Sequence, residues 1–136
     1  MTDAFPITIY HNPDCGTSRN ALAMIEQAGY RPDIIDYRSR GWTREQLGGL
    51  MSAMGVTPRD LLRDKGTPAG ELGLLDPSAG DEAIIAAMLA HPILVNRPIV
   101  VTPKGTRLCR PSEAVLPLLD RAPAEFVKED GEVIRT

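Results

Sequence analysis

The chain has 136 residues, 43% of them hydrophobic and 24% charged, a composition typical of a soluble globular protein with one sizeable core. Its net charge of −3 argues against a general affinity for nucleic acid or for an anionic membrane surface. No apolar run approaches the length of a membrane span and the first residues lack the features of a signal peptide, so we expect a cytoplasmic protein.

The first recognisable pattern is a strand, a tight turn and a helix. Residues 7–10 alternate apolar and polar side chains, which predicts a half-buried strand. Asn12 and Pro13 interrupt it, because proline has no N–H for a sheet and this pair favours a turn. After Gly16 the apolar residues recur at helical spacing, and the stripe ends at Gly29.

A cysteine stands where this predicted helix begins. The free N–H groups and the dipole of a helix N-terminus can lower the pKa of a thiol from about 8.5 to about 3.5–7.5, so Cys15 is predicted to be a reactive thiolate. His11 could supply a cation or a hydrogen bond to it, whereas Asp14 disfavours a second negative charge. A buried structural cysteine is the alternative.

A second strand and several helices follow. The run 33–37 predicts a strand, and strand, helix and strand in about thirty residues predict a βαβ unit with parallel strands. Thr43 with Gln46 forms a capping box for a helix that ends at Gly55. Thr57 is the N-cap of a short helix that runs to Arg63.

The second half of the chain begins with a loop and returns to strands. Residues 66–80 are rich in Gly, Pro, Asp and Ser and predict a loop, and residues 81–90 predict a helix. A strand is expected to begin at Pro98, and a turn at residues 103–105 leads to a return strand at 106–110. Ser112 is expected to cap a last helix.

Three arginines stand at the ends of separate predicted elements, namely Arg63, Arg97 and Arg110. The planar guanidinium group pairs with tetrahedral oxyanions through two hydrogen bonds and remains charged when it is partly buried. A solvated surface charge is the alternative for any one of them. Arg97 is flanked by apolar strand residues, where a polar side chain needs a partner.

The order β-α-β, helical insert, β-β-α, with a cysteine at the first βα turn, resembles the thioredoxin-like α/β fold. The resemblance implies a four-stranded mixed sheet flanked by helices, a helical insert between the βαβ and ββα halves, and Pro98 in the cis form. We expect one domain at residues 1–122 and a polar C-terminal tail at residues 123–136, with Phe126 and Val127 as its anchors.

Four motifs, at residues 11–20, 61–63, 91–101 and 106–113, resemble the glutaredoxin-dependent arsenate reductase family. By this resemblance Cys15 is the nucleophile and His11 tunes its thiolate. The resemblance also implies that three arginines hold the substrate oxyanion: Arg63, Arg97 and Arg110. Ser18 and Pro98 would have structural roles near the site.

The family reduces arsenate to arsenite through a covalent intermediate on the cysteine, with glutathione as co-substrate and glutaredoxin as partner. An external reductant fits this chain, because Ser18 occupies the position of a second cysteine in a CxxC motif. The other thiol, Cys109, lies in a predicted strand beside Leu108 and is expected to be buried and inert. We expect no bound cofactor and no metal.

Three alternative functions require other features of the sequence. A phosphatase-like arsenate reductase needs an arginine six residues after the cysteine, where this chain has Ala21, which excludes that class. A thioredoxin-like redox sensor that binds a protein partner would need a resolving cysteine, for which Ser18 is no substitute. A glutathione- or anion-binding module without turnover remains an alternative.

Overall fold

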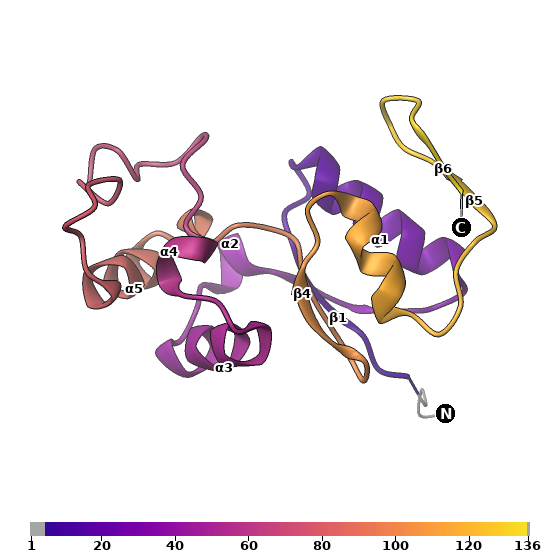
Figure 1. The fold of residues 1–136 in the computed structure, drawn as a ribbon, viewed down its shortest axis with the longest axis horizontal. Coiled ribbons are helices and arrows are strands. Elements are labelled where there is room, and N and C mark those ends of the chain that lie inside the picture. Colours follow the sequence, from indigo (N-terminus) through magenta and orange to yellow (C-terminus); the bar gives the residue numbers. More distant parts are fainter. Residues whose placement is uncertain (1–4, 136) are drawn as a thin grey trace. The chain divides into compact units, whose positions relative to one another are not determined.

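Four short strands form one mixed sheet in the computed structural model, which describes residues 5–135 (Figure 1). The strand order is β2-β1-β3-β4, with β1 parallel to β2 and β3 antiparallel to both β1 and β4. The strands are β1 (Thr8–His11), β2 (Asp33–Asp36), β3 (Ile99–Thr102) and β4 (Gly105–Leu108). The four-stranded mixed sheet predicted from the sequence is therefore confirmed.

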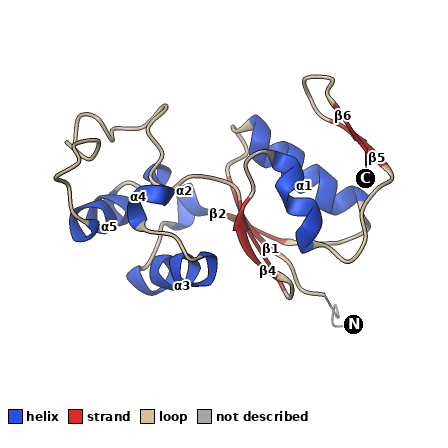
Figure 2. Cartoon of the chain, viewed as in Figure 1, coloured by secondary structure: helices blue, strands red, loops and turns tan. Residues whose placement is uncertain are grey.

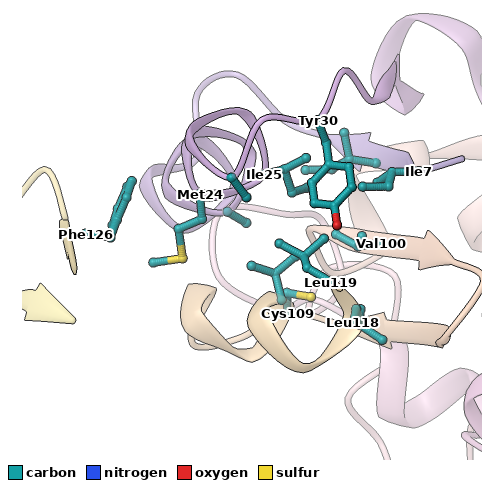
Figure 3. Packing of buried hydrophobic residues seen from close by; sticks show 13 residues of the cluster. Ile7, Met24, Ile25, Tyr30, Val100, Cys109, Leu118, Leu119 and Phe126 are labelled. Atoms are coloured by element: carbon teal, nitrogen blue, oxygen red, sulfur yellow. The ribbon is translucent and has the colours of Figure 1, made fainter. Parts of the chain in front are cut away.

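The helix α1 (Gly16–Gln27) follows β1 directly and completes the predicted βαβ unit with β2. Its buried face contributes Ala21, Met24 and Ile25 to a hydrophobic cluster that also contains Ile9 of β1 and Val100 of β3. Figure 3 shows Met24, Ile25 and Val100 in this cluster. Residues at this spacing lie on one side of a helix, so the apolar stripe seen in the sequence is the face that packs in the core.

The last helical element differs from its prediction. Residues 112–118 form the 3-10 helix η2 (Ser112–Leu118), which contacts α1, and not an α-helix capped by Ser112. Ser112 lies inside the helix and is buried, and Pro111 precedes it. Pro117 lacks an N–H, which shortens any regular α-helical hydrogen-bond ladder in this segment.

The chain divides into two compact units. Unit 1 consists of the residues up to Asp36 and those from Arg97 onward, and it contains the sheet, α1 and η2. Unit 2 consists of residues 37–96. Its elements are helical (Figure 2), and they are α2 (Tyr37–Arg40), α3 (Arg44–Met54), α4 (Pro58–Leu61), α5 (Asp81–Ala90) and η1 (Pro92–Leu94).

Local signals predicted most of unit 2. Thr43 and Gln46 form the expected capping box of α3, and Gly55 ends that helix with a left-handed backbone at φ 69°. Thr57 caps α4 as predicted. The short helix α2 was not predicted, because Tyr37 continues the apolar run of β2 in the sequence. The Tyr37 ring is buried and stacks on the Trp42 ring, and the two ring centroids are 5.2 Å apart.

The C-terminal segment, expected as a polar tail, contains a two-stranded hairpin of β5 (Glu125–Val127) and β6 (Val133–Arg135). Phe126 is 3% exposed and belongs to the core cluster of unit 1 (Figure 3). Val127, its neighbour, is 56% exposed on the other face of the strand. Of the helices within residues 5–135, none has both the length and the apolar character of a membrane span.

We expect Phe126→Ala to lower the free energy of unfolding by about 3–5 kcal/mol, the usual cost of removing a buried phenyl ring. The matched change Val127→Ala, on the exposed face of the same strand, should alter it by less than about 0.5 kcal/mol. Urea denaturation followed by circular dichroism measures both. Equal effects of the two substitutions would contradict the docking of the hairpin through Phe126.

Candidate active site

The turn between β1 and α1, residues 12–15, is called the Cys15 turn here, and it places the sulfur atom of Cys15 at the start of α1. The N–H of Cys15 donates to the carbonyl of Asn12 at 3.0 Å, and the N–H of Asp14 donates to Oδ1 of Asn12 at 2.9 Å. Cys15 is the N-cap of α1, with an extended backbone at φ −103° and ψ 121°. Its side chain therefore lies among the free N–H groups of the first helical turn.

The surroundings of Cys15 favour the thiolate. The thiol is 9% exposed, and this burial raises its pKa. The backbone N–H of Ser18 and hydrogen bonds from Arg97 and Arg110 outweigh burial and bring the pKa down to about 7. Nη1 of Arg110 lies 3.7 Å from Sγ of Cys15. Cys15 is consequently more acidic than an ordinary thiol, and the thiolate is present at neutral pH.

The register of the sheet explains why two distant arginines meet this cysteine. Ile99 of β3 pairs with Tyr10 of β1, so Arg97, two residues before Ile99, lies at the end of the sheet where β1 runs into the Cys15 turn. Ile99 also pairs with Leu108 of β4, so Arg110 follows at the same end.

Both arginines directly precede a cis peptide bond, Arg97–Pro98 and Arg110–Pro111. The cis form of Pro98 was expected from the fold, whereas the cis form of Pro111 was not. Nη1 of Arg110 donates to the carbonyl of Arg97 at 2.9 Å, which links the two residues. Arg97 is 9% exposed, and its Nε and Nη1 atoms are buried. Two guanidinium groups thus stand beside one sulfur atom.

His11 contacts Ser18, a residue in the first turn of α1. Nδ1 of His11 and Oγ of Ser18 are 2.6 Å apart, and the same Oγ accepts the N–H of Asn12 at 3.1 Å. All three residues are buried. The interaction holds the first turn of α1 against the end of β1, and the backbone N–H of Ser18 in turn lowers the pKa of Cys15.

Arg63, the third arginine of the sequence motifs, belongs to unit 2. There its N–H donates to the carbonyl of Leu94 at 2.7 Å, and its Nε donates to the carbonyl of Lys65 at 3.2 Å. Its Nη1 lies 3.4 Å from Oδ1 of Asn96. Contact of Arg63 with the oxyanion stays a prediction.

The second thiol behaves as predicted. Cys109 has no exposed surface and lies in the hydrophobic cluster, and burial raises its pKa to about 12. It is therefore protonated and inert at neutral pH. Across residues 5–135, His, Cys, Asp and Glu side chains form no group of three that could hold a metal ion. The chemistry of the site is that of a thiolate beside two guanidinium groups.

Comparison with known proteins identifies the family. The sequence model of the ArsC family matches residues 10–118 of this chain. The chain belongs to the ArsC family. It is 60% identical over 129 residues to an arsenate reductase of Synechocystis sp., covering 94% of this chain and 92% of that protein, and 56% identical to one of Rhizobium meliloti with the same coverage.

Solved structures agree with this assignment. The structure of an arsenate reductase from Vibrio cholerae superposes with a TM-score of 0.80 at 40% sequence identity, covering 86% of this chain and all of that chain. A second arsenate reductase structure, from Yersinia pestis and described as putative, matches with a TM-score of 0.76 at 38% identity. The thioredoxin-like fold expected for this ArsC-family protein is confirmed.

Sequence reasoning missed three contributors to the site of this ArsC-family protein. Asn12 closes the Cys15 turn through its main chain and side chain, although the sequence indicated only a strand breaker. Arg19 donates to the carbonyl of Pro13 at 2.8 Å and pairs with Glu129. The positions of Asn12 and Arg19 inside the first motif were a signal, but Glu129 carried none.

We expect alkylation of Cys15 by iodoacetamide to rise about tenfold per pH unit below pH 7 and to level off above it, because only the thiolate reacts. Peptide mass spectrometry after brief exposure measures the modified fraction. Cys109 serves as the internal control and should remain unmodified throughout this range. A midpoint near the ordinary thiol value of about 8.5 would contradict the stabilisation by Ser18, Arg97 and Arg110.

Proposed function

We propose that this protein reduces arsenate to arsenite, with Cys15 as the nucleophile. The observation that carries the proposal is the place of the Cys15 thiol, which lies at the N-terminus of α1 beside the guanidinium groups of Arg97 and Arg110 and has a pKa lowered to about 7. That arrangement suits a nucleophile that must attack an anion, because the cations offset the repulsion between thiolate and substrate. The name arsenate reductase, carried by relatives 54–60% identical to this chain, supports the same reaction.

Arsenate is a tetrahedral anion at neutral pH, and the site offers it two kinds of donor. The backbone N–H of Ser18, in the first turn of α1, donates to the Cys15 sulfur, and a helix N-terminus is a favourable site for an anion. The planar guanidinium groups of Arg97 and Arg110 can each donate two parallel hydrogen bonds to two oxygens of an oxyanion. Arg63 completes the binding site in this proposal, as the resemblance of its motif implies.

The first chemical step forms a bond between sulfur and arsenic. The Cys15 thiolate attacks the arsenic atom, and one arsenate oxygen leaves with a proton as hydroxide or water, which gives a Cys15–S–As(V) adduct. Arsenic stays in the +5 state in this step. Arg97 and Arg110 stabilise the negative charge that accumulates on the remaining oxygens.

Reduction requires two electrons, which two thiols supply as they join in one disulfide. Water then cleaves the Cys15–S–As(III) bond, which releases arsenite and restores the Cys15 thiol. Overall, arsenate and two thiols give arsenite, a disulfide and water. The chain has two cysteines, of which Cys109 is buried and protonated, so the reducing thiols come from outside. We infer that glutathione provides the first thiol and a glutaredoxin the second, as in the family that the motifs resemble.

The test is arsenite production from arsenate in the presence of glutathione, a glutaredoxin and NADPH-linked glutathione reductase, with each thiol component omitted in turn. Turnover that needs both components supports the proposal, and turnover with thioredoxin alone would replace the proposed electron source. Cys15→Ser should reduce turnover below detection. Retained turnover in that variant would remove Cys15 from the mechanism. No turnover from the intact chain would favour a thiol sensor.

We expect Arg97→Ala to raise the KM for arsenate about 10–100-fold, because a hydrogen bond to a charged group contributes about 1.5–3 kcal/mol. Arg97→Lys keeps the positive charge but lacks the planar guanidinium group with its two parallel N–H donors, so its KM should lie between those of the wild type and Arg97→Ala. Steady-state kinetics of the coupled reaction measure both. The matched control is Arg107→Ala in β4, an exposed arginine that should leave the KM unchanged. An unaltered KM in Arg97→Ala would remove Arg97 from the oxyanion site.

A further inference from the structure

An ion pair joins the C-terminal hairpin to the first turns of α1, next to the Cys15 turn. Nε and Nη2 of Arg19 donate to the two carboxylate oxygens of Glu129 at 2.8 and 3.0 Å. The main-chain N–H of Glu129 donates to Oδ1 of Asn20 at 3.1 Å. Three hydrogen bonds therefore link segments that lie about 110 residues apart in the sequence.

The hairpin holds Glu129 in a structured turn. The N–H of Lys128 donates to the carbonyl of Glu132 at 2.8 Å, and the N–H of Gly131 donates to the carbonyl of Lys128 at 2.9 Å. The ammonium group of Lys128 pairs with Glu113 of η2 at 2.8 Å, and its side chain is only 10% exposed. Together with the buried ring of Phe126, these contacts anchor the hairpin on unit 1.

The remaining nitrogen of Arg19 reaches the turn that carries the nucleophile. Nη1 of Arg19 donates to the carbonyl of Pro13 at 2.8 Å. Pro13 lies between Asn12 and Cys15, whose main-chain hydrogen bond closes the turn. All three nitrogens of one guanidinium group are thus engaged, two on Glu129 and one on the Cys15 turn.

We propose that Arg19, oriented by Glu129, is a positioning residue that fixes the Pro13 carbonyl and with it the location of the Cys15 sulfur. The proposal takes from the proposed function only that Cys15 is the nucleophile. An exposed ion pair by itself contributes little to stability, and the side chains of Arg19 and Glu129 are 43% and 49% exposed. A small displacement of a reacting atom, in contrast, has a large effect on rate.

The polar groups around the sulfur come from several elements of unit 1. Arg97 precedes β3 and Arg110 follows β4, while the His11 ring of β1 contacts the hydroxyl of Ser18. On the helix side, the hydrogen bonds to Glu129 raise the pKa of Arg19, and the charges of Cys15 and Asp14 raise it further. Arg19 is therefore close enough to interact electrostatically with the thiolate. A test must distinguish the effect of its charge on Cys15 from the effect of its hydrogen bonds on the position of Cys15.

Two substitutions distinguish an electrostatic effect of Arg19 on the pKa of Cys15 from a positioning effect, because the two effects predict different changes in that pKa. Glu129→Ala removes a negative charge, which by electrostatics alone lowers the pKa of Cys15. If the pair positions the turn, the sulfur drifts from its hydrogen-bond donors and the pKa rises. Arg19→Lys keeps the charge and loses the fork, so electrostatics alone predicts no change whereas positioning again predicts a rise.

The experiment measures the pH dependence of Cys15 alkylation by iodoacetamide in the full-length protein, together with the kcat and KM for arsenate. The variants are Arg19→Lys, Glu129→Ala and the matched control Glu125→Ala. Glu125 lies in the same hairpin, is 53% exposed and pairs with Arg135 at 3.5 Å. Circular dichroism confirms that each variant is folded, and either Arg19→Lys or Glu129→Ala suffices if the other does not fold.

We expect the alkylation midpoint to rise by about one pH unit in Arg19→Lys and Glu129→Ala, toward the ordinary thiol value of about 8.5. The kcat should fall about tenfold, less than the hundredfold loss that accompanies a displacement of about 1 Å. Glu125→Ala should match the wild type in both measurements.

A lower midpoint in Glu129→Ala, unchanged midpoints in both test variants, or an equal rise in Glu125→Ala would overturn the positioning role. Absence of arsenate turnover in the wild type would instead overturn the proposed function. The alkylation midpoints would still decide the role of Arg19, since they do not involve arsenate.

Discussion

The structure of this site depends on keeping a negative charge on a sulfur atom that is almost excluded from water. Burial acts against the Cys15 thiolate, because a charge loses hydration energy when water is removed. The backbone N–H of Ser18 and the guanidinium groups of Arg97 and Arg110 offset this loss and bring the pKa to about 7. Each of these donors must be held within hydrogen-bond distance, and the surrounding fold provides that constraint.

The other cysteine shows what burial does without such donors. Cys109 lies in the core cluster of the same unit, and burial raises its pKa to about 12. The nearby charge of Arg107 lowers that pKa, but the desolvation of Cys109 outweighs it. The pKa values of the two cysteines therefore differ for two reasons: Cys15 has hydrogen-bond donors that Cys109 lacks, and Cys109 is more deeply buried.

The donors come to Cys15 from both the local sequence and the sheet. Ser18 arrives with the first turn of α1, and its hydroxyl is shared by His11 and the main chain of Asn12. The arginines arrive because the antiparallel pairing of β1, β3 and β4 brings the residues that flank β3 and β4 to the end of β1. The pairing of four short strands therefore brings Arg97 and Arg110, which lie more than 80 residues after Cys15 in the sequence, close to the sulfur atom of Cys15.

The sequence by itself determined the elements whose signals are local. The alternation in β1, the helical stripe of α1 and the capping residues Thr43 and Thr57 involve neighbours a few residues apart, so short-range hydrogen bonding and side-chain periodicity suffice. The reactive character of Cys15 was predictable for the same reason, because a helix N-terminus is a local feature.

Only the tertiary structure decided the rest. The sequence predicted a polar tail at residues 123–136 with Phe126 and Val127 as anchors, but it indicated neither the hairpin of β5 and β6 nor that only Phe126 of the two is buried, because the partners of Phe126 lie far away in the sequence. The pairing of Arg19 with Glu129 spans 110 residues and leaves no periodic pattern. The α-helix expected at η2 and the missed helix α2 have the same origin, since packing in each unit overrides a weak local preference. Contacts between residues distant in sequence are set by the folded core, and no local pattern records them.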